Sequence, residues 1–374
     1  MRKQILLGTT ALMVGAIMAP GFAAAEENPI RLSVGGFQNE FFGIGDVDDS
    51  VGTDLGNTNL FNDGEISFTG ETTLDNGLTF GVYVDMESTQ NADQIDEAYS
   101  YVMGEFGKVE IGAQNLATYT TFWDVVAPAV GVPINSGWIT VFTPIPSGFG
   151  DAGSFLSPLL TTNLDIGNDE AQISYYSPRF AGFQFTGGFA PAISNSGNGQ
   201  YLVANEGTQY HNAFGVGLNF SNEFNGFSLG FAAAYNQASV DTVRQAAGAD
   251  DFQQVKVGAS IGFAGFTVAG SYANQMVGMV DSANSVSNKG QAYDVGAKYE
   301  TGPWAASVTY FHGEQRDTIA TAGDDEADSV VGAVSYAVGP GITTSLSIFY
   351  GKQEDESGAN GESTVGILGL SLSF

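Results

Sequence analysis

The chain has 374 residues, with 41 acidic and 11 basic residues, a formal charge of −30, 51 Gly, 27 Phe, 15 Tyr and no Cys. The acidity excludes nucleic acid as an electrostatic partner, the lack of cysteine excludes disulfides and thiolate metal sites, and the aromatic content excludes a disordered chain. Two architectures are left open, a soluble all-β protein and a transmembrane β-barrel.

Residues 1 to 25 have the pattern of a secretory signal peptide. Two basic residues precede an apolar run from Ile5 to Ile17, and the small residues Ala23, Ala24 and Ala25 follow. We predict cleavage before Glu26, which leaves nine basic against 41 acidic residues, a formal charge of −32. The alternative, a membrane-anchoring helix, is disfavoured because the run is short and Pro20 ends it.

The remaining chain, residues 26 to 374, is predicted to be one domain of strands about ten residues long. In the stretches 227 to 235, 255 to 263 and 368 to 374, every second residue is apolar and the residues between are mostly polar or small. This period of two predicts one apolar and one polar face. In a soluble sandwich the apolar faces would form a shared core, whereas in a barrel they would face lipid.

Short turns that carry Gly, Asn or Pro alternate with long connections along the chain. The turns lie at 75 to 77, 105 to 107, 180 to 182, 223 to 226, 264 to 265, 302 to 303 and 339 to 341. The long connections lie near 43 to 61, 88 to 95, 116 to 167, 191 to 209, 237 to 251, 274 to 290, 313 to 328 and 352 to 362. Seven turns and eight connections join sixteen strands, which predicts an all-β, 16-stranded antiparallel transmembrane barrel without a free edge.

Aromatic residues near the predicted strand ends also favour the barrel, because such barrels carry aromatic girdles at both membrane interfaces. We expect the girdles to include Tyr235, Tyr299, Trp304, Tyr310, Tyr350 and Phe374.

Two motifs resemble those of the Gram-negative general porins. The stretch from Tyr175 to Phe183, YYSPRFAGF, is similar to a strand-turn-strand motif of that family. Ala98-Tyr99, followed by GEFGKVEIG at 104 to 112, is similar to the hairpin that precedes the family's third loop, and Phe374 matches its usual last residue. The acidity and the scarcity of Arg resemble the alphaproteobacterial branch. The resemblance implies a homotrimer in the bacterial outer membrane, next to lipid and lipopolysaccharide.

Residues 116 to 167 contain no sustained alternation and are rich in aromatics, Pro and Gly. The resemblance implies that this long connection is the third loop and folds into the barrel as a constriction loop. Its carboxylates Asp124, Asp151 and Asp165 are then expected at the pore constriction. The alternative, that each of them only forms a turn or caps a helix, stays open.

Strand alternation assigns residues to the wall opposite the long connection. The inward-facing set is Arg31, Lys256, Lys298, Glu65, Glu71, Asp85, Asp96 and Glu110. Family members often carry an arginine cluster on the early strands, but Asp96 and Ala113 lie where the motif alignment expects two of those arginines. We therefore predict a negative channel that prefers cations. The alternative is that most acids lie on outer loops, away from the pore.

Acid clusters in the predicted loops suggest calcium, whose ligands are grouped carboxylate oxygens. The candidates are Asp46, Asp48, Asp49, Asp324, Asp325 and Glu326. The first cluster resembles the start of an EF-hand loop, but Val51 and Asn57 stand where that loop requires Gly and Glu. Solvated loop faces are the alternative, and no other cofactor is expected.

The predicted function is passive diffusion of small hydrophilic solutes and cations, without catalysis. The two histidines, His211 and His312, lie far apart in the sequence, and neither has an identifiable catalytic partner. The close alternative is a substrate-specific channel, for example for sugars, in which aromatics of the long connection form a stacking track. Those aromatics are Phe122, Trp123, Trp138, Phe142 and Phe149. Two further alternatives are a surface or adhesion protein anchored by its barrel and a soluble extracellular β-protein.

Overall fold

The computed structural model describes residues 30–48, 54–88, 94–135, 139–149, 157–193, 210–240, 245, 250–277, 280–281, 286–318 and 323–374. The predicted signal peptide and its cleavage site lie outside these ranges. In the described part of the chain, no helix is long and apolar enough to cross a membrane.

Sixteen strands of seven or more residues form one antiparallel sheet among the described residues. They are β1 (Arg31–Val47), β2 (Thr58–Thr73), β3 (Thr79–Glu87), β4 (Ala98–Gly104), β5 (Gly107–Gln114), β6 (Glu170–Tyr176), β7 (Phe183–Ile193), β8 (Tyr210–Phe224), β9 (Phe227–Val240), β10 (Phe252–Phe263), β11 (Phe266–Val277), β13 (Val286–Thr301), β14 (Trp304–Thr318), β15 (Asp325–Gly339), β16 (Ile342–Glu354) and β17 (Asn360–Ser373). The two-residue β12 (Val280–Asp281) pairs with β13 in the connection between β11 and β13.

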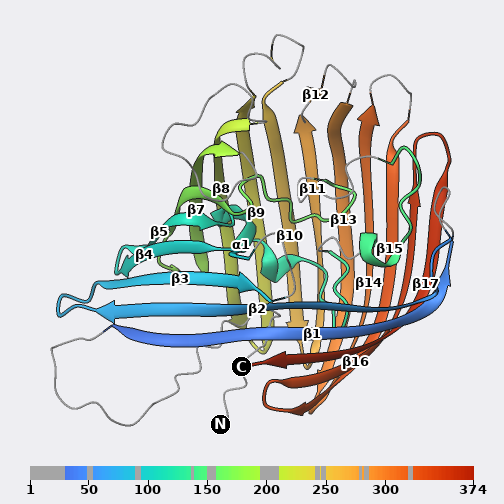
Figure 1. Cartoon of the computed structure of the whole chain (residues 1–374). Coiled ribbons are helices and arrows are strands. Elements are labelled where there is room, and N and C mark those ends of the chain that lie inside the picture. Colours follow the sequence, from blue (N-terminus) through green and yellow to red (C-terminus); the bar gives the residue numbers. More distant parts are fainter. Residues whose placement is uncertain are drawn as a thin grey trace.

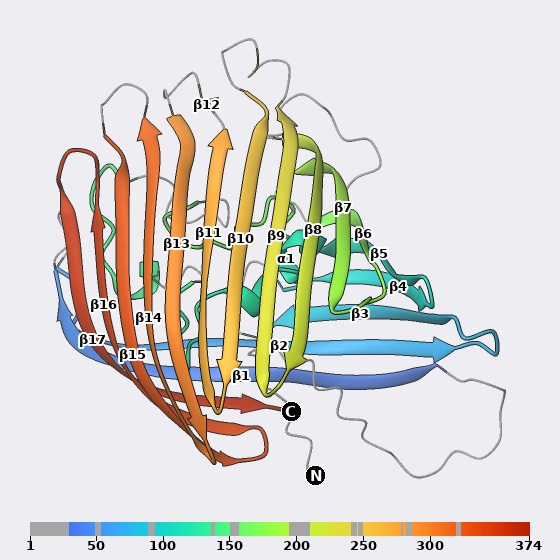
Figure 2. The ribbon, with the colours of Figure 1, turned by 180° about the vertical axis from the view of Figure 1, so that it is seen from behind.

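The sheet closes into a barrel because β1 pairs on one side with β2 and on the other with β17. Each strand otherwise pairs with its neighbours in the sequence. In Figure 1, β1 and β2 cross in front of the long strands β8 to β15, and Figure 2 shows those long strands from behind. This confirms the predicted sixteen-stranded antiparallel barrel.

The short turns lie where the sequence predicts them, and left-handed residues make the tightest ones. In the β8–β9 turn, Asn225 and Gly226 have φ of 51° and 84°, and in the β10–β11 turn Ala264 and Gly265 have φ of 50° and 86°. Two successive positive φ values match the right-handed twist of a hairpin. They explain how only two residues reverse the chain at each of these turns.

Several strands are longer than the predicted ten residues. The strand β1 has 17 residues and β2 has 16, so the first connection runs from 48 to 57 and not from 43 to 61. At about 3.3 Å per residue, a strand of this length exceeds the roughly 25 Å of a barrel's apolar band. The pairing therefore continues beyond the band, where polar residues such as Asp46 and Asn62 stand among exposed apolar ones and make the strand hard to recognise in the sequence.

The two faces of the barrel wall differ as the alternation predicts. On β16, Leu346 and Ile348 are 55% and 63% exposed, whereas Ser345 and Ser347 on the other face are buried. We call the face with the exposed apolar residues the apolar face and the opposite one the polar face.

Aromatic pairs border the apolar face at its two ends. At the short-turn end, Phe266 lies 4.3 Å from Tyr299, and Trp304 lies 4.7 Å from Tyr336, measured between ring centroids. At the loop end, Tyr235 lies 6.3 Å from Phe214 and Tyr310 lies 6.0 Å from Tyr293. The spacing of the two rows along the strands fits an apolar band between two membrane interfaces.

Candidate functional site

The long connection (residues 116 to 167) joins β5 to β6 and lies against the polar face of the wall. It contains the short helices α1 (Ala117–Thr120), η1 (Trp123–Val125) and α2 (Ile139–Phe142). Helix α1 contacts β7, β8 and β9, η1 contacts β9, β10 and β11, and α2 contacts β16. In Figure 1 the helix α1 lies in front of β8 to β10, and in Figure 2 it lies behind them.

Glycines on the polar face make room for this contact. A Cβ at Gly188 of β7 would lie 2.6 Å from Leu116, and one at Gly258 of β10 would lie 2.6 Å from Val125. Gly313 of β14 and Gly361 of β17 are likewise covered by the backbone of the long connection. Because these positions have no side chain, the connection approaches the wall more closely than any larger residue would allow.

An apolar cluster holds the middle of the long connection. Val132, Ile134, Ile139 and Leu159 are at most 1% exposed and pack on Phe349 and other wall residues of the polar face. Fully burying one such side chain stabilises the folded state by about 1.5–3 kcal/mol. This explains why the stretch is apolar although its described residues form no strand and no long helix.

Two charged wall residues form polar contacts beneath the long connection. The ammonium of Lys256 on β10 donates to Asn163 Oδ1 at 2.9 Å and to the Leu164 carbonyl at 3.0 Å. The carboxylate of Asp294 on β13 accepts from the Ala127 N–H at 2.9 Å and from Thr162 Oγ1 at 2.8 Å. Both side chains are almost fully buried.

The wall formed by β2 to β5 carries carboxylates on its polar face. They are Asp63, Glu65 and Glu71 of β2, Asp85 and Glu87 of β3, Glu97 next to β4, and Glu110 of β5. We call this set, together with Asp96, the acidic wall. The carboxylate oxygens of Glu65, Glu87 and Asp96 lie within 4.8 Å of one another.

Tyrosines alternate with these acids. Tyr83 donates to Asp85 at 2.6 Å, and Tyr101 donates to Glu71 at 2.7 Å. The Tyr99 ring lies between them, 5.1 Å from Tyr83 and 6.5 Å from Tyr101 between centroids. Strand alternation predicts that acids of these strands face inward. It also places the three tyrosines on that face, but their row was not predicted from the sequence.

Among the acids of this wall, Glu97 has a pKa close to neutral pH. Its carboxylate accepts from the side chain of Asn115 at 2.6 Å and from the Asn115 N–H at 3.3 Å. Burial raises the pKa of Glu97 to about 7, although the two hydrogen bonds oppose the shift. The charge of this wall therefore changes within the physiological range.

Two basic residues accompany the acidic wall, and both face carboxylates. Arg31 of β1 lies opposite Glu71 of β2 in the strand register. Lys108 of β5 lies 2.5 Å from Glu110 and stacks over the Tyr176 ring at 4.9 Å. The charge of Lys108 is thus offset locally, and Arg31 lies across the strand pair from an acid.

The sequence-predicted constriction residues are not all in one place. Arg31, Glu71 and Asp96 belong to the wall of β1 to β5, whereas Asp124 is exposed on η1. Asp165 is 2% exposed and accepts from the backbone N–H groups of Leu116 and Gly167. Asp151 lies outside the described residues.

The two predicted lysines differ in accessibility. Lys298 is partly exposed and lies 3.2 Å from Glu300. Lys256 does point to the polar face, as alternation predicts, but at 1% exposure it lies beneath the long connection and cannot line an open pore. Alternation determines the face of a residue but not what covers it.

The aromatics of the long connection mostly pack against protein. Phe122 is fully buried, and Phe142 lies 5.4 Å from Phe349 between ring centroids. Trp123 is half-buried and meets Tyr119 edge-on at 5.3 Å. Phe149 packs on the apolar cluster, and Trp138 lies outside the described residues. Phe122 is therefore unavailable to the predicted stacking track.

The predicted calcium ligands are spread apart. Asp46 and Asp48 are exposed at the end of β1, where Asp48 accepts from the Glu362 N–H at 3.0 Å, and Asp49 is outside the described residues. Asp325 is fully buried, whereas Asp324 and Glu326 are exposed. Successive strand residues point to opposite faces, so Asp325 and Glu326 do not converge.

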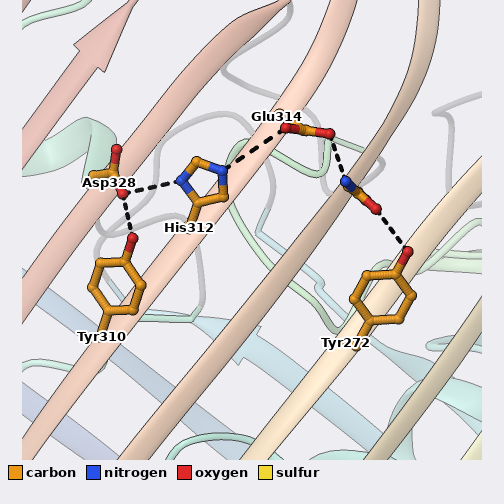
Figure 3. A network of polar contacts seen from close by, with 6 residues as sticks. Tyr272, Tyr310, His312, Glu314 and Asp328 are labelled. Atoms are coloured by element: carbon orange, nitrogen blue, oxygen red, sulfur yellow. Dashed lines mark hydrogen bonds and ion pairs between the residues drawn. The ribbon is translucent and has the colours of Figure 1, made fainter.

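A polar network that includes the loop-end aromatic Tyr310 lies on the apolar face (Figure 3). Tyr310 donates to Asp328 at 2.6 Å, and His312 Nδ1 lies 3.0 Å from the same oxygen. Glu314 lies 4.0 Å from His312 and is joined to Tyr272 through Gln291. These polar groups indicate where the apolar band ends.

The family model described as Gram-negative porin matches residues 8–357. None of the curated proteins matches the chain.

Solved porin structures share the fold at low sequence identity. A mutant of the Rh. blastica porin superposes with a TM-score of 0.57 and 18% identity, covering 92% of this chain and 100% of that one. Salmonella typhi OmpF, in a complex with daunomycin, gives 0.62 and 17%, covering 92% and 97%. A loop-deletion mutant of OmpT, an outer membrane protein of Vibrio cholerae, gives 0.57 and 13%, covering 92% and 99%.

Proposed function

The chain belongs to the Gram-negative porins, and from this premise we propose that it forms a channel for passive diffusion of small hydrophilic solutes and ions, with a preference for cations. The family and the closed barrel support an outer-membrane porin channel. In this proposal nothing is turned over chemically, and selectivity depends on the width of the channel and the charge that lines it.

The long connection is proposed to lie in the lumen and to narrow it. This is supported by its contacts with the polar face of β7 to β11 and of β16, and by the glycines that receive it. On the wall of β2 to β5 opposite the connection, six of the eight acids then remain partly exposed, whereas Asp85 and Glu110 are buried. Asp124, exposed on η1, would be the described acid of the connection nearest to solutes.

The cation preference rests on one observation, the acidic wall. Eight carboxylates are gathered there, and the two basic residues beside them face acids. A channel lined by one sign of charge concentrates ions of the opposite sign. Ionised acids on this wall are therefore expected to raise the cation concentration at the narrowest point.

Export by residues 1 to 25, assembly as a homotrimer and contact with lipopolysaccharide are proposed with the function. The charged network on the apolar face lies where the strands leave the apolar band, which fits a lipid headgroup region. Calcium remains a proposal for the exposed acids at the loop end.

A substrate-specific channel is the second candidate, and the tyrosine row favours it. Tyr99 and Tyr101 are half-buried on the wall, next to acceptor carboxylates, and rings in such a row can stack on a sugar or an organic cation. This differs from the predicted track on the long connection, whose Phe122 is buried.

Conductance of the purified protein in planar bilayers distinguishes the candidates. A diffusion channel gives current that rises linearly with salt and is not blocked by millimolar sugars or amines. Saturable current with solute block would favour the substrate-specific channel. Absence of channels, from protein that migrates as a heat-modifiable barrel, would contradict both.

A further inference from the structure

We propose that Lys256 and Asp294 are positioning residues, a pair of oppositely charged buried anchors that fix the long connection to the wall and so set the conductance. This inference rests on the proposed function, because it requires the long connection to narrow the channel. Neither residue is expected to touch a solute.

Lys256 joins the two ends of the long connection. Its ammonium contacts the Thr118 carbonyl at 3.4 Å near the start, and Asn163 and Leu164 near the end. The Phe122 ring lies 5.2 Å from the same nitrogen, measured to the centroid. One side chain of β10 thus holds together residues that are more than forty positions apart in the sequence.

Asp294 joins three points of the long connection, two on its outward course and one near its end. Besides Ala127 and Thr162, it accepts a short hydrogen bond from the Asn135 amide. Ser271 of β11 donates to it at 2.5 Å from its hydroxyl and at 3.0 Å from its N–H, which orients the carboxylate. Both oxygens are therefore occupied, and most of their donors belong to the connection.

The two anchors lie on the same face of the wall, on β10 and β13, with β11 between them. Asp294 is opposite Ser271, Ser271 is opposite Gly258, and Gly258 is two residues from Lys256 on β10. The connection crosses this site on both its outward and its return course. A buried ion that loses its partners is strongly unfavourable, so displacing the connection is costly at these two points in particular.

The first test replaces Lys256 by Met, which keeps most of the volume and removes the charge and the donors. In single-channel records, K256M is expected to spend about tenfold more time in altered-conductance states and to close at lower voltage, since each charge-assisted hydrogen bond favours the anchored state by roughly tenfold or more. Lys352→Met is the matched control, because Lys352 lies on the apolar face and pairs with Glu354 at 2.6 Å. Wild-type gating is expected of K352M.

Asn163→Ala tests the same contact from the connection and leaves the barrel wall unchanged, so it remains informative if K256M does not assemble. The two single changes share the Lys256–Asn163 contact, so the double variant K256M/N163A is expected to show less than the sum of their separate effects. Asp294→Asn should also increase the time spent in altered-conductance states. The new side-chain NH2 group takes the place of an acceptor oxygen and is repelled by the donor NH2 group of Asn135.

The outcomes separate this inference from the proposed function. If the wild-type barrel forms no channels, the proposed function fails. If the wild type conducts, and N163A and D294N gate as it does, the anchors are refuted while the porin function stands. Additive effects of K256M and N163A would also contradict the inference, because they would indicate independent damage.

Discussion

At the residue scale, strand alternation does not distinguish a lysine that lines a channel from a lysine that is buried beneath a loop, because both point to the same face. The sequence predicts that Lys256 points inward, and it does, but its contacts are with residues 92 to 138 positions away. No local pattern encodes such partners. The acids of β2 and β3 were predictable, because strand parity alone places them on the polar face. No described segment of the chain covers this wall completely.

The pH dependence of selectivity is predicted from Glu97. Because burial raises its pKa to about 7, the carboxyl is mostly neutral at pH 6 and mostly ionised at pH 8, so the channel gains negative charge as the pH rises. We expect the cation preference, measured as a reversal potential in a KCl gradient, to increase across this interval. Glu97→Gln should remove most of the increase, and an unchanged pH profile in E97Q would contradict the assignment.

Gly258 gives a prediction about stability. An alanine Cβ there would lie 2.6 Å from Val125 Cγ2 and 3.1 Å from Ser271 Cβ, so the long connection or the wall must shift. Gly258→Ala is expected to destabilise the protein by about 1–3 kcal/mol, as overpacking does. The readout is the urea concentration at which heat-modifiable migration is lost. Gly332→Ala, whose Cβ would meet no atom within 4 Å, should leave that midpoint unchanged.

At the element scale, the sequence identifies the long connection by its composition but does not give its path. Apolar residues without strand or helix periodicity predict that it packs against something. Which wall it packs against depends on contacts such as Ile139 with the cluster around Phe349, far apart in the chain. The strand ends were also underestimated, because β1 and β2 continue beyond the apolar band with polar residues.

A disulfide tests where the long connection lies. The hydroxyls of Thr162 and Ser271 are 2.6 Å apart, and the chain has no native cysteine, so T162C/S271C can form a single crosslink. We expect oxidation to form it in the folded barrel, since the bond would join groups already in contact. The control T162S/S271C has a single cysteine, cannot form the crosslink and should show no redox response. Failure to crosslink, with folding intact, would place the connection elsewhere.

At the scale of the whole molecule, the sixteen strands, their order and their two faces followed from alternation and from the spacing of the turns, because a closed antiparallel sheet is determined by local signals repeated around it. The charge of −30 was also evident, but its distribution was not. The structure gathers eight of the acids on one wall and buries Lys256 and Asp294 against the long connection.

The sign of the ion selectivity tests the central claim most directly. Wild-type channels in a KCl gradient at pH 7.5 are expected to give a reversal potential of the cation-selective sign. Replacing Glu65, Glu71 and Glu87 by Gln should move it toward zero, whereas Asp75→Asn combined with Glu105→Gln and Glu223→Gln, three exposed acids at the short-turn end, should not. An anion-selective wild type, or equal effects of the two triple variants, would contradict the account.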